Sequence, residues 1–277
     1  MEQISYAMTP DEYARCDTAA LRERFLVDGL FQDDALTLRY THHDRMLIAG
    51  AVPRRSSVAL EAADVLGTGY FLERREVGIV NIGGEGAVRV GDDEHALAPR
   101  DCLYVGRGHE RVSLASSSAS DPARFYLVSA PAHAALPTQR VSLADGQAAR
   151  LGSPEEGNER TLTKLIHAEG VESSQLMLGL TQMHGASIWN TMPAHIHDRR
   201  TEIYLYFALP AEARVFHLMG PPDETRHLVV ANEQAVISPG WSIHAGAGTQ
   251  PYAFIWAMAG ETYSFQDMAV VAPADLR

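Results

Sequence analysis

The sequence predicts a mainly β protein made of two similar units, with a few short helices. Most of the 277 residues fall in short β-prone runs, such as VGIVNI, EIYLYF and YAFIWAM, which are separated by Gly, Pro, Asp and Asn. Many short strands with regularly spaced turn signals are typical of sandwiches and barrels. The length is large for one compact core and small for three, which favours two domains or one large β unit.

Two segments predict helices. TPDE begins with Thr9, which can cap a helix, and continues with a proline suited to the first helical position and a glutamate that completes a capping box. We expect this helix to run to about Phe25. A second helical piece is expected from Ser153 to Leu165, because the serine can cap and acidic residues follow in the first turn.

An internal repeat supports the division into two units. DDEHALAPRDCLYVGRG, which begins at Asp92, matches NEQAVISPGWSIHAGAG, which begins at Asn232, at a constant offset of 140 residues. In this register Tyr104 falls opposite His244, so a histidine is present in the second copy alone. We expect one β unit in two copies, at about 30–130 and 150–265, and we place the domains at 1–135, with the N-terminal helix, and 136–277.

Charge and composition exclude several partners. The net charge is −12, and an acidic surface disfavours nucleic acid and anionic membranes as partners. The N-terminal residues have no basic start followed by an apolar run, and the longest apolar stretches are too short to span a bilayer, so neither a signal peptide nor a membrane span is expected. Cys16 and Cys102 lie far apart, which argues against a disulfide framework and fits a reducing cytoplasm.

The stretch PAHIHDRRTEIYLYF carries the clearest chemical signal. His195 and His197 project from one face of a strand, so both imidazoles can reach one ion. Glu202 lies an odd number of positions from both histidines, so on a straight strand its side chain would project from the opposite face. A turn or bulge in the intervening residues DRRT has to bring it back to the histidine face. A later segment delivers His244. Histidine pairs on strands are also common in structural roles, but three imidazoles with one carboxylate suit Zn, Fe(II), Mn, Ni or Co rather than Ca or Mg.

These residues resemble the two metal motifs of the cupin superfamily, complete in the second half and absent from the first. The stretches YFLERREVGIVNIGGEG, IWNTMPAHIHDRRTEIYLYF and ETRHLVVANEQAVISPGWSIHAGAGTQ also resemble the 5-keto-4-deoxyuronate isomerase family. The likeness extends from about Tyr40 to Asp267. It implies a bicupin, with two tandem jelly-roll-like β-barrel lobes of which the N-terminal one is degenerate and binds no metal.

The resemblance also implies an activity and a cofactor. The family is a zinc-dependent aldose–ketose isomerase of pectin and uronate breakdown, which converts 5-dehydro-4-deoxy-D-glucuronate to 3-deoxy-D-glycero-2,5-hexodiulosonate. By this likeness one zinc ion per subunit is held by His195, His197, Glu202 and His244, while Mn, Fe, Ni and Co remain chemically suitable. A cytoplasmic homohexamer is expected on the same ground.

Other residues are candidates for the chemistry. The isomerisation can proceed through proton transfer to a nearby base or through a hydride shift between carbons. Tyr206, and with it Tyr204, are the candidate catalytic residues, because they share a face with Glu202; filling the barrel is the alternative role for both.

A substrate carboxylate requires a cationic partner, preferably arginine. The candidates for substrate binding are Arg160, Lys164, Gln182 and Arg199. Residues 189–192 are expected to line the cavity, and Trp256 is assigned either to the cavity or to the core.

Two other classes of function stay open. A cupin dioxygenase also uses three histidines and a glutamate, with Fe(II), and a bicupin can be a non-enzymatic sugar sensor or storage protein. A complete ligand set argues against storage, and the sequence contains no DNA-binding segment that a sensor would use. We expect His217 and His227 to be surface or barrel-wall residues, because they lack the paired context.

Overall fold

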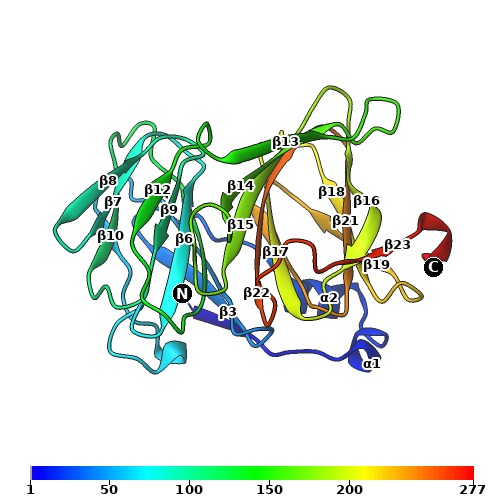
Figure 1. Cartoon of the computed structure of the whole chain (residues 1–277), viewed down its shortest axis with the longest axis horizontal. Coiled ribbons are helices and arrows are strands. Elements are labelled where there is room, and N and C mark those ends of the chain that lie inside the picture. Colours follow the sequence, from blue (N-terminus) through cyan, green and yellow to red (C-terminus); the bar gives the residue numbers. More distant parts are fainter. Residues whose placement is uncertain (1) are drawn as a thin grey trace. The chain divides into compact units, whose positions relative to one another are not determined.

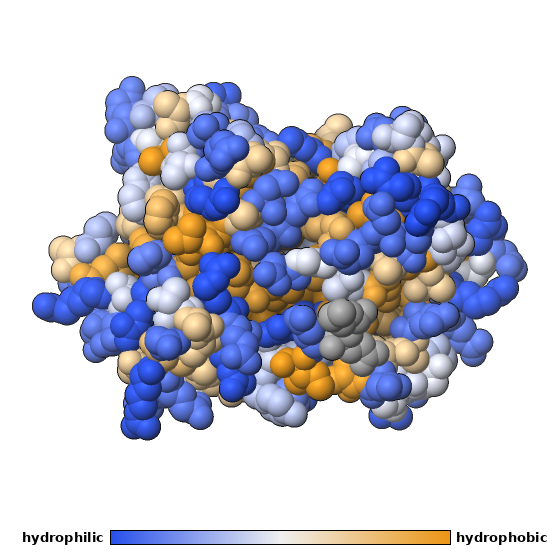
Figure 2. Space-filling model, turned by 180° about the vertical axis from the view of Figure 1, so that it is seen from behind, coloured by the Kyte–Doolittle hydropathy of each residue, from blue (hydrophilic) through white to orange (hydrophobic). Residues whose placement is uncertain are grey.

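The computed structural model describes residues 2–277 and is mainly β, with two short α-helices, as predicted (Figure 1). The chain forms two compact units. Unit 1 comprises the chain up to Ser5 together with Gly29–Gln147 and Leu165–Met177, and unit 2 comprises Tyr6–Asp28, Ala148–Lys164 and Leu178–Arg277. Hydrophilic residues cover most of the face shown in Figure 2. Within residues 2–277, no helix is long and apolar enough to cross a membrane.

Unit 1 is a sandwich of two sheets. Its strands are β1 (Glu2–Ser5), β3 (Leu36–Thr41), β4 (Leu47–Ala51), β5 (Val58–Ala59), β6 (Arg75–Asn81), β7 (Gly86–Val90), β8 (Asp93–Leu97), β9 (Cys102–Val105), β10 (Val112–Ser116), β11 (Phe125–Pro131) and β12 (Gln139–Val141), with a 3₁₀ turn at Asp64–Leu66. The sheet orders are β1-β3-β4-β11-β6-β9-β12 and β5-β10-β7-β8. Alternate side chains of both sheets, such as Val77, Ile79 and Leu114, meet in one apolar core.

Unit 2 has the same construction. It contains α1 (Pro10–Tyr13), α2 (Thr18–Phe25), β2 (Leu26–Val27), β13 (Gln147–Leu151), β14 (Arg160–Ile166), β15 (Met177–Met183), β16 (Trp189–Ile196), β17 (Arg200–Phe207), β18 (Val215–Gly220), β19 (Arg226–Val230), β20 (Gln234–Ser238), β21 (Ile243–Gly248), β22 (Ala253–Gly260) and β23 (Ala269–Val271), with a 3₁₀ turn at Pro273–Asp275. The sheet orders are β13-β14-β15-β22-β17-β20-β2 and β19-β18-β21-β16-β23.

The two units repeat one topology, which confirms the predicted duplication, but the predicted register of the repeat is wrong. The order β3-β4-β11-β6-β9 recurs as β14-β15-β22-β17-β20, and β5-β10-β7-β8 recurs as β16-β21-β18-β19. The counterpart of β21 is therefore β10. The 140-residue offset instead sets β9, with Tyr104, against β21, with His244. An apolar run, a proline turn and a second apolar run occur at many strand connections, so this pattern does not determine the register.

The first predicted helix is divided in two. Its start is as predicted, because the Thr9 hydroxyl accepts the Glu12 backbone N–H and the Glu12 carboxylate accepts the Thr9 N–H at 2.8 Å. The helix ends after one turn, and Asp17 then caps α2 by accepting the N–H of Ala20 at 2.8 Å. A second capping residue inside the segment thus stops one helix and begins another.

The helix predicted from Ser153 to Leu165 is wrong. Residues 154–157 form a turn, and Arg160–Ile166 is strand β14. The run RTLTKLI alternates in character and contains β-branched threonines, which suit a strand packed on both faces. The serine and the acidic residues that suggested a helix cap belong to the turn before the strand.

The N-terminal helices belong to unit 2 and not to the first domain of residues 1–135 in which the order of the chain predicts them. The Tyr13 hydroxyl donates to the carbonyl oxygen of Met219 at 3.0 Å, and its ring lies 5.2 Å from that of Trp241. Strand β2 extends the seven-stranded sheet by pairing with β20. Residues 6–28, coloured blue in Figure 1, thus complete the core of the later unit, which the order of the chain does not reveal.

Candidate metal centre

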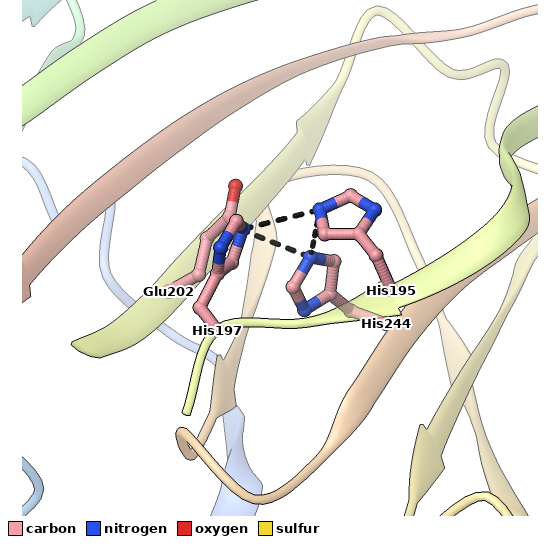
Figure 3. Close-up of side chains that lie close together, drawn as sticks. All are labelled: His195, His197, Glu202 and His244. Atoms are coloured by element: carbon pink, nitrogen blue, oxygen red, sulfur yellow. Dashed lines mark hydrogen bonds and ion pairs between the residues drawn. The ribbon is translucent and has the colours of Figure 1, made fainter. Parts of the chain in front are cut away.

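Three histidines and a glutamate converge inside unit 2 (Figure 3). His195 on β16 and His244 on β21 are direct partners in the antiparallel pair of the five-stranded sheet. His197 follows the end of β16, and a turn at residues 198–199 leads into β17, where Glu202 lies in the seven-stranded sheet. The predicted polar turn is therefore present. It brings Glu202 to the histidines by moving the chain to the facing sheet.

The four donor atoms are spaced as ligands of one ion. His195 Nε2 lies 3.1 Å from His197 Nε2 and 2.9 Å from His244 Nε2. Glu202 Oε2 lies 3.0 Å from both His197 Nε2 and His244 Nε2. Ligands at about 2.0–2.1 Å from a first-row divalent ion lie about 2.8–3.0 Å apart at neighbouring octahedral positions and about 3.3–3.4 Å apart in tetrahedral geometry. The residues therefore fit such an ion.

The protonation states also suit metal binding. Burial, followed by the neighbouring imidazole of His244, lowers the pKa of His195 to about 2, and burial lowers the pKa of His244. Burial by itself raises the pKa of Glu202, but attraction to His244 and hydrogen bonds from His197 and His244 outweigh it and hold the pKa well below its usual value. At neutral pH the carboxylate is ionised and the His195 and His244 imidazoles are neutral, as metal ligands are.

Neighbouring polar groups orient two of the imidazoles. His197 Nδ1 lies 2.9 Å from the carbonyl oxygen of Asp267 and 2.8 Å from Nη2 of Arg200, and His244 Nδ1 lies 3.3 Å from the hydroxyl of Ser238. In a metal-bound form, an Nδ1–H of His244 that donates to the Ser238 hydroxyl would leave its Nε2 lone pair directed at the centre. Arg200, which is buried, also donates to the Asp267 carbonyl at 3.1 Å and thereby holds this segment against the cluster.

A cavity of about 260 Å³ opens onto the cluster. Most of its wall is apolar, and the polar part of the wall consists of a few side chains on neighbouring strands. Such a mixture is usual for small-molecule sites, in which the polar groups determine orientation. Three members of the cluster line it, namely His195, His197 and Glu202. The other lining residues are Leu151, Arg160, Leu162, Thr181, Asn190, Thr191, Met192, Pro193, Tyr204, Phe254, Trp256, Met258, Phe265, Met268 and Val270.

The two candidate tyrosines have different surroundings. Both lie on the face of β17 that carries Glu202, as predicted. Tyr204 lines the cavity, and burial, the charge of Glu202 and a hydrogen bond to it raise the pKa of its hydroxyl. Tyr206 lies outside the lining, and its hydroxyl is 2.7 Å from Nδ1 of the fully buried His217. The tyrosine that we preferred for catalysis is thus the one farther from the cavity, and His217 is a barrel-wall residue.

One of the four candidates for substrate binding lines the cavity, namely Arg160. The Lys164 ammonium lies 4.7 Å from the centre of the Phe265 ring. Arg199 is half exposed and forms an ion pair with Asp267 at 2.5 Å. Gln182 donates to the carbonyl of Met183 at 3.1 Å. None of the last three residues lines the cavity, although Lys164 contacts the ring of the lining residue Phe265.

Sequence reasoning missed Thr181 and left Trp256 undecided. Both lie on the cavity side of central strands of the seven-stranded sheet. A threonine directly after the apolar run MLGL was the one signal for Thr181. By contrast, the expectation for residues 189–192 was correct in part, because Asn190, Thr191 and Met192 line the cavity.

The fold and the cluster define a two-unit, cupin-like protein with a His₃Glu candidate metal centre. Among solved structures, an IolB-like protein from Salmonella typhimurium LT2 is similar at a TM-score of 0.68 and 16% identity, over 82% of this chain and 87% of that one. Oxalate decarboxylase from Bacillus subtilis is similar at a TM-score of 0.57 and 11% identity, over 82% and 70% of the two chains. At these identities the likeness concerns the fold alone.

The profile of the KduI/IolB family matches residues 27–272, and the chain belongs to this family. Its sequence is 55% identical over 274 residues to the 4-deoxy-L-threo-5-hexosulose-uronate ketol-isomerase of Shouchella clausii, with 99% of each chain covered. It is 53% identical over 266 residues to the protein of the same name from Bacillus subtilis, with 96% of each chain covered.

Proposed function

We propose that the protein is a metal-dependent ketol-isomerase that converts 5-dehydro-4-deoxy-D-glucuronate to 3-deoxy-D-glycero-2,5-hexodiulosonate in pectin and uronate breakdown. The observation that carries the proposal is the His₃Glu cluster at the wall of a cavity of suitable size. Relatives that match nearly the whole chain at more than 50% identity are named as ketol-isomerases of 4-deoxy-L-threo-5-hexosulose-uronate.

The substrate has functional groups along its whole length. It carries an aldehyde at C1, hydroxyls at C2 and C3, a ketone at C5 and a carboxylate at C6. The reaction exchanges the oxidation states of C1 and C2, so negative charge develops on oxygens at one end of the molecule. The carboxylate at the other end takes no part in the chemistry and serves for binding.

His195, His197, Glu202 and His244 would hold one zinc ion, the metal expected from the family resemblance, although Mn, Fe, Ni and Co also suit the donor set. When bound, the metal supplies a Lewis acid that stabilises the negative charge on the C1 and C2 oxygens. The chain itself positions those oxygens beside Tyr204. The pKa of Tyr204 is raised, so its hydroxyl is protonated at neutral pH, and its one hydrogen is shared with Glu202 in the free protein. Once Glu202 holds the metal, this hydrogen would be donated to the developing charge.

Arg160 is proposed to bind the substrate carboxylate. Its guanidinium donates to the carbonyl oxygen of Asn158 at 2.8 Å, and its buried Nε has no partner among residues 2–277. Burial lowers the pKa of this arginine, but an arginine remains charged at neutral pH. A partly buried, incompletely paired cation in an apolar cavity is a suitable partner for a carboxylate.

Replacing Arg160 with alanine is therefore expected to raise KM roughly 10- to 100-fold, since hydrogen bonds to charged groups contribute about 1.5–3 kcal/mol each. Steady-state kinetics of the purified variant measure this effect. Lys164→Met is the matched control, because Lys164 is a nearby cation on the same strand that does not itself line the cavity, and the KM of this variant should change much less. An unchanged KM for Arg160→Ala would contradict the assignment.

The activity is tested by incubating the metal-loaded protein with the keto-uronate released from unsaturated uronates and following the diketo product. Absence of turnover would reject the proposal. Iron in the purified protein together with substrate-dependent oxygen consumption would identify a dioxygenase instead. Binding without any conversion would identify a non-enzymatic sugar-binding protein.

We also propose that the protein is a cytoplasmic homohexamer, as the family resemblance implies. Cys16 and Cys102 are both free thiols, which suits a reducing compartment. Sedimentation velocity at micromolar concentration tests the assembly.

A further inference from the structure

Three buried polar atoms of the cavity wall have no hydrogen-bond partner within residues 2–277: Thr181 Oγ1, Trp256 Nε1 and Arg160 Nε. Thr181 is fully buried and Trp256 is 3% exposed. Buried donors are almost always paired in native proteins, because an unmet donor loses its hydrogen bonds to water without replacement. Three such atoms in one wall indicate that a bound molecule supplies their partners.

The three residues and Glu202 lie across the seven-stranded sheet in a defined order. Glu202 is on β17, Trp256 on β22, Thr181 on β15 and Arg160 on β14, and each strand is the neighbour of the next. Trp256 is the direct cross-strand partner of Tyr204. Strands lie about 4.8 Å apart, so the three spacings from β17 to β14 amount to about 14 Å along the sheet. A six-carbon chain fits this interval, with the metal at one end and a reaching arginine side chain at the other.

The indole of Trp256 is held in place by its neighbours. A Cβ at Gly179 would collide with Cζ2 of Trp256, so the ring lies directly on the backbone of β15 at a residue without a side chain. The Phe265 ring packs 5.5 Å from the indole. Glycine in a strand interior often marks such a close approach. A ring fixed in this way presents its N–H at a constant position, which suits recognition.

We propose that Trp256 and Thr181 form a specificity-determining subsite that binds the substrate oxygens between the metal and the carboxylate. The proposal rests on the proposed function. Following the order of the strands, Trp256 Nε1 donates to the C3 oxygen, and the Thr181 hydroxyl donates to the C5 oxygen. Indole N–H is a donor only, whereas a threonine hydroxyl both donates and accepts, so Thr181 can bind a ketone or a hydroxyl at C5.

The subsite selects for oxygen at defined carbons. A site built to hydrogen-bond a substrate oxygen rejects molecules that lack it, because its own buried groups then stay unpaired. Chains without an oxygen at C3 or C5 are therefore discriminated against, even if they carry the reacting aldehyde and the carboxylate.

The test uses Trp256→Phe and Thr181→Val, each of which removes the polar atom and keeps most of the volume. Binding of D-glucuronate, which has oxygens at C3, C5 and C6, to the metal-loaded protein is measured by calorimetry, together with KM and kcat for the keto-uronate. Metal content and the thermal midpoint are measured for every variant. The matched controls are Thr163→Val and Trp241→Phe. Thr163 is buried and lies outside the lining, and the Trp241 indole N–H donates to the carbonyl of Met8 at 3.0 Å.

We expect each variant to weaken D-glucuronate binding about 5- to 10-fold and to raise KM more than it lowers kcat, with metal content unchanged. The controls should bind as the wild type does. The subsite would be overturned if both variants bound D-glucuronate as tightly as the wild type, or if the wild type did not bind it at all. It would also be overturned if the controls lost as much affinity, or if the loss paralleled metal depletion or reduced thermal stability. Binding that behaves as expected in a protein that does not convert the keto-uronate would refute the proposed function and leave the subsite standing.

Discussion

Replacing His197 with alanine is expected to lower kcat/KM at least about 1000-fold and to remove the bound metal. The cluster has four donor atoms within 4.8 Å of one another, and the loss of one imidazole leaves three with a gap on the side of Glu202. A Lewis acid contributes several kcal/mol to stabilising a developing oxyanion, and about 4 kcal/mol corresponds to a factor of 1000 in rate. Elemental analysis and turnover of the purified variant measure both effects.

His227→Ala is the matched control, because His227 is exposed on β19 and away from the lining, and this variant should keep metal and activity. Treating the wild type with a chelator should reproduce the loss, and adding zinc should restore activity to the wild type but not to the variant. Full activity of His197→Ala with a normal metal content would refute the assignment of the site.

Replacing Glu76 with alanine is expected to destabilise the protein by about 3–5 kcal/mol, the range found when a buried, paired charge loses its network. Glu76 is completely buried in unit 1. One carboxylate oxygen accepts the Tyr104 hydroxyl at 2.7 Å and the Ser174 N–H at 2.6 Å. The other accepts the N–H groups of Gln175 and Leu176 at 2.9 and 2.8 Å.

In the alanine variant four donors lose their acceptor, three of them on the backbone of a single loop. The thermal midpoint should fall by on the order of 10 °C, and calorimetry or chemical denaturation measures the change. Glu76→Gln should also destabilise, because an amide nitrogen then faces donors that need an acceptor. Glu94→Ala, which removes an exposed ion pair with Arg89, is the control and should cost less than about 1 kcal/mol. A midpoint for Glu76→Ala equal to that of the control would contradict this role.

Glu76 also shows why similarity between the two halves of the sequence is an incomplete guide. ERREVGIVNI resembles DRRTEIYLYF, and with one residue omitted Glu76 matches Glu202. In the structure Val77 faces the core of unit 1, so its neighbour Glu76 points away from that core. The strands that correspond to β16, β17 and β21 place Val58, Val77 and Leu114 in the interior. On these corresponding strands, the interior of unit 1 therefore holds apolar side chains where the interior of unit 2 holds the imidazoles and the carboxylate.

The β class, the duplication and the four converging side chains could all be predicted from the amino-acid sequence. These features depend on local chemistry, namely the period of two in strands, turn residues between short apolar runs, and donor atoms at recognisable spacings. The predicted turn after His197 also depends on local residues, because the Asp198–Arg199 step is polar and short.

The remaining features depend on which strands face one another, and that arrangement is visible in the three-dimensional fold alone. Glu202 reaches the histidines because the chain moves to the facing sheet, and Arg160, Thr181 and Trp256 share a wall because β14, β15 and β22 are neighbours. The same strand order separates Tyr204 at the cavity from Tyr206 at His217, and it assigns residues 6–28 to unit 2. Contacts between segments far apart in the chain depend on sheet order and register, which a local pattern does not encode.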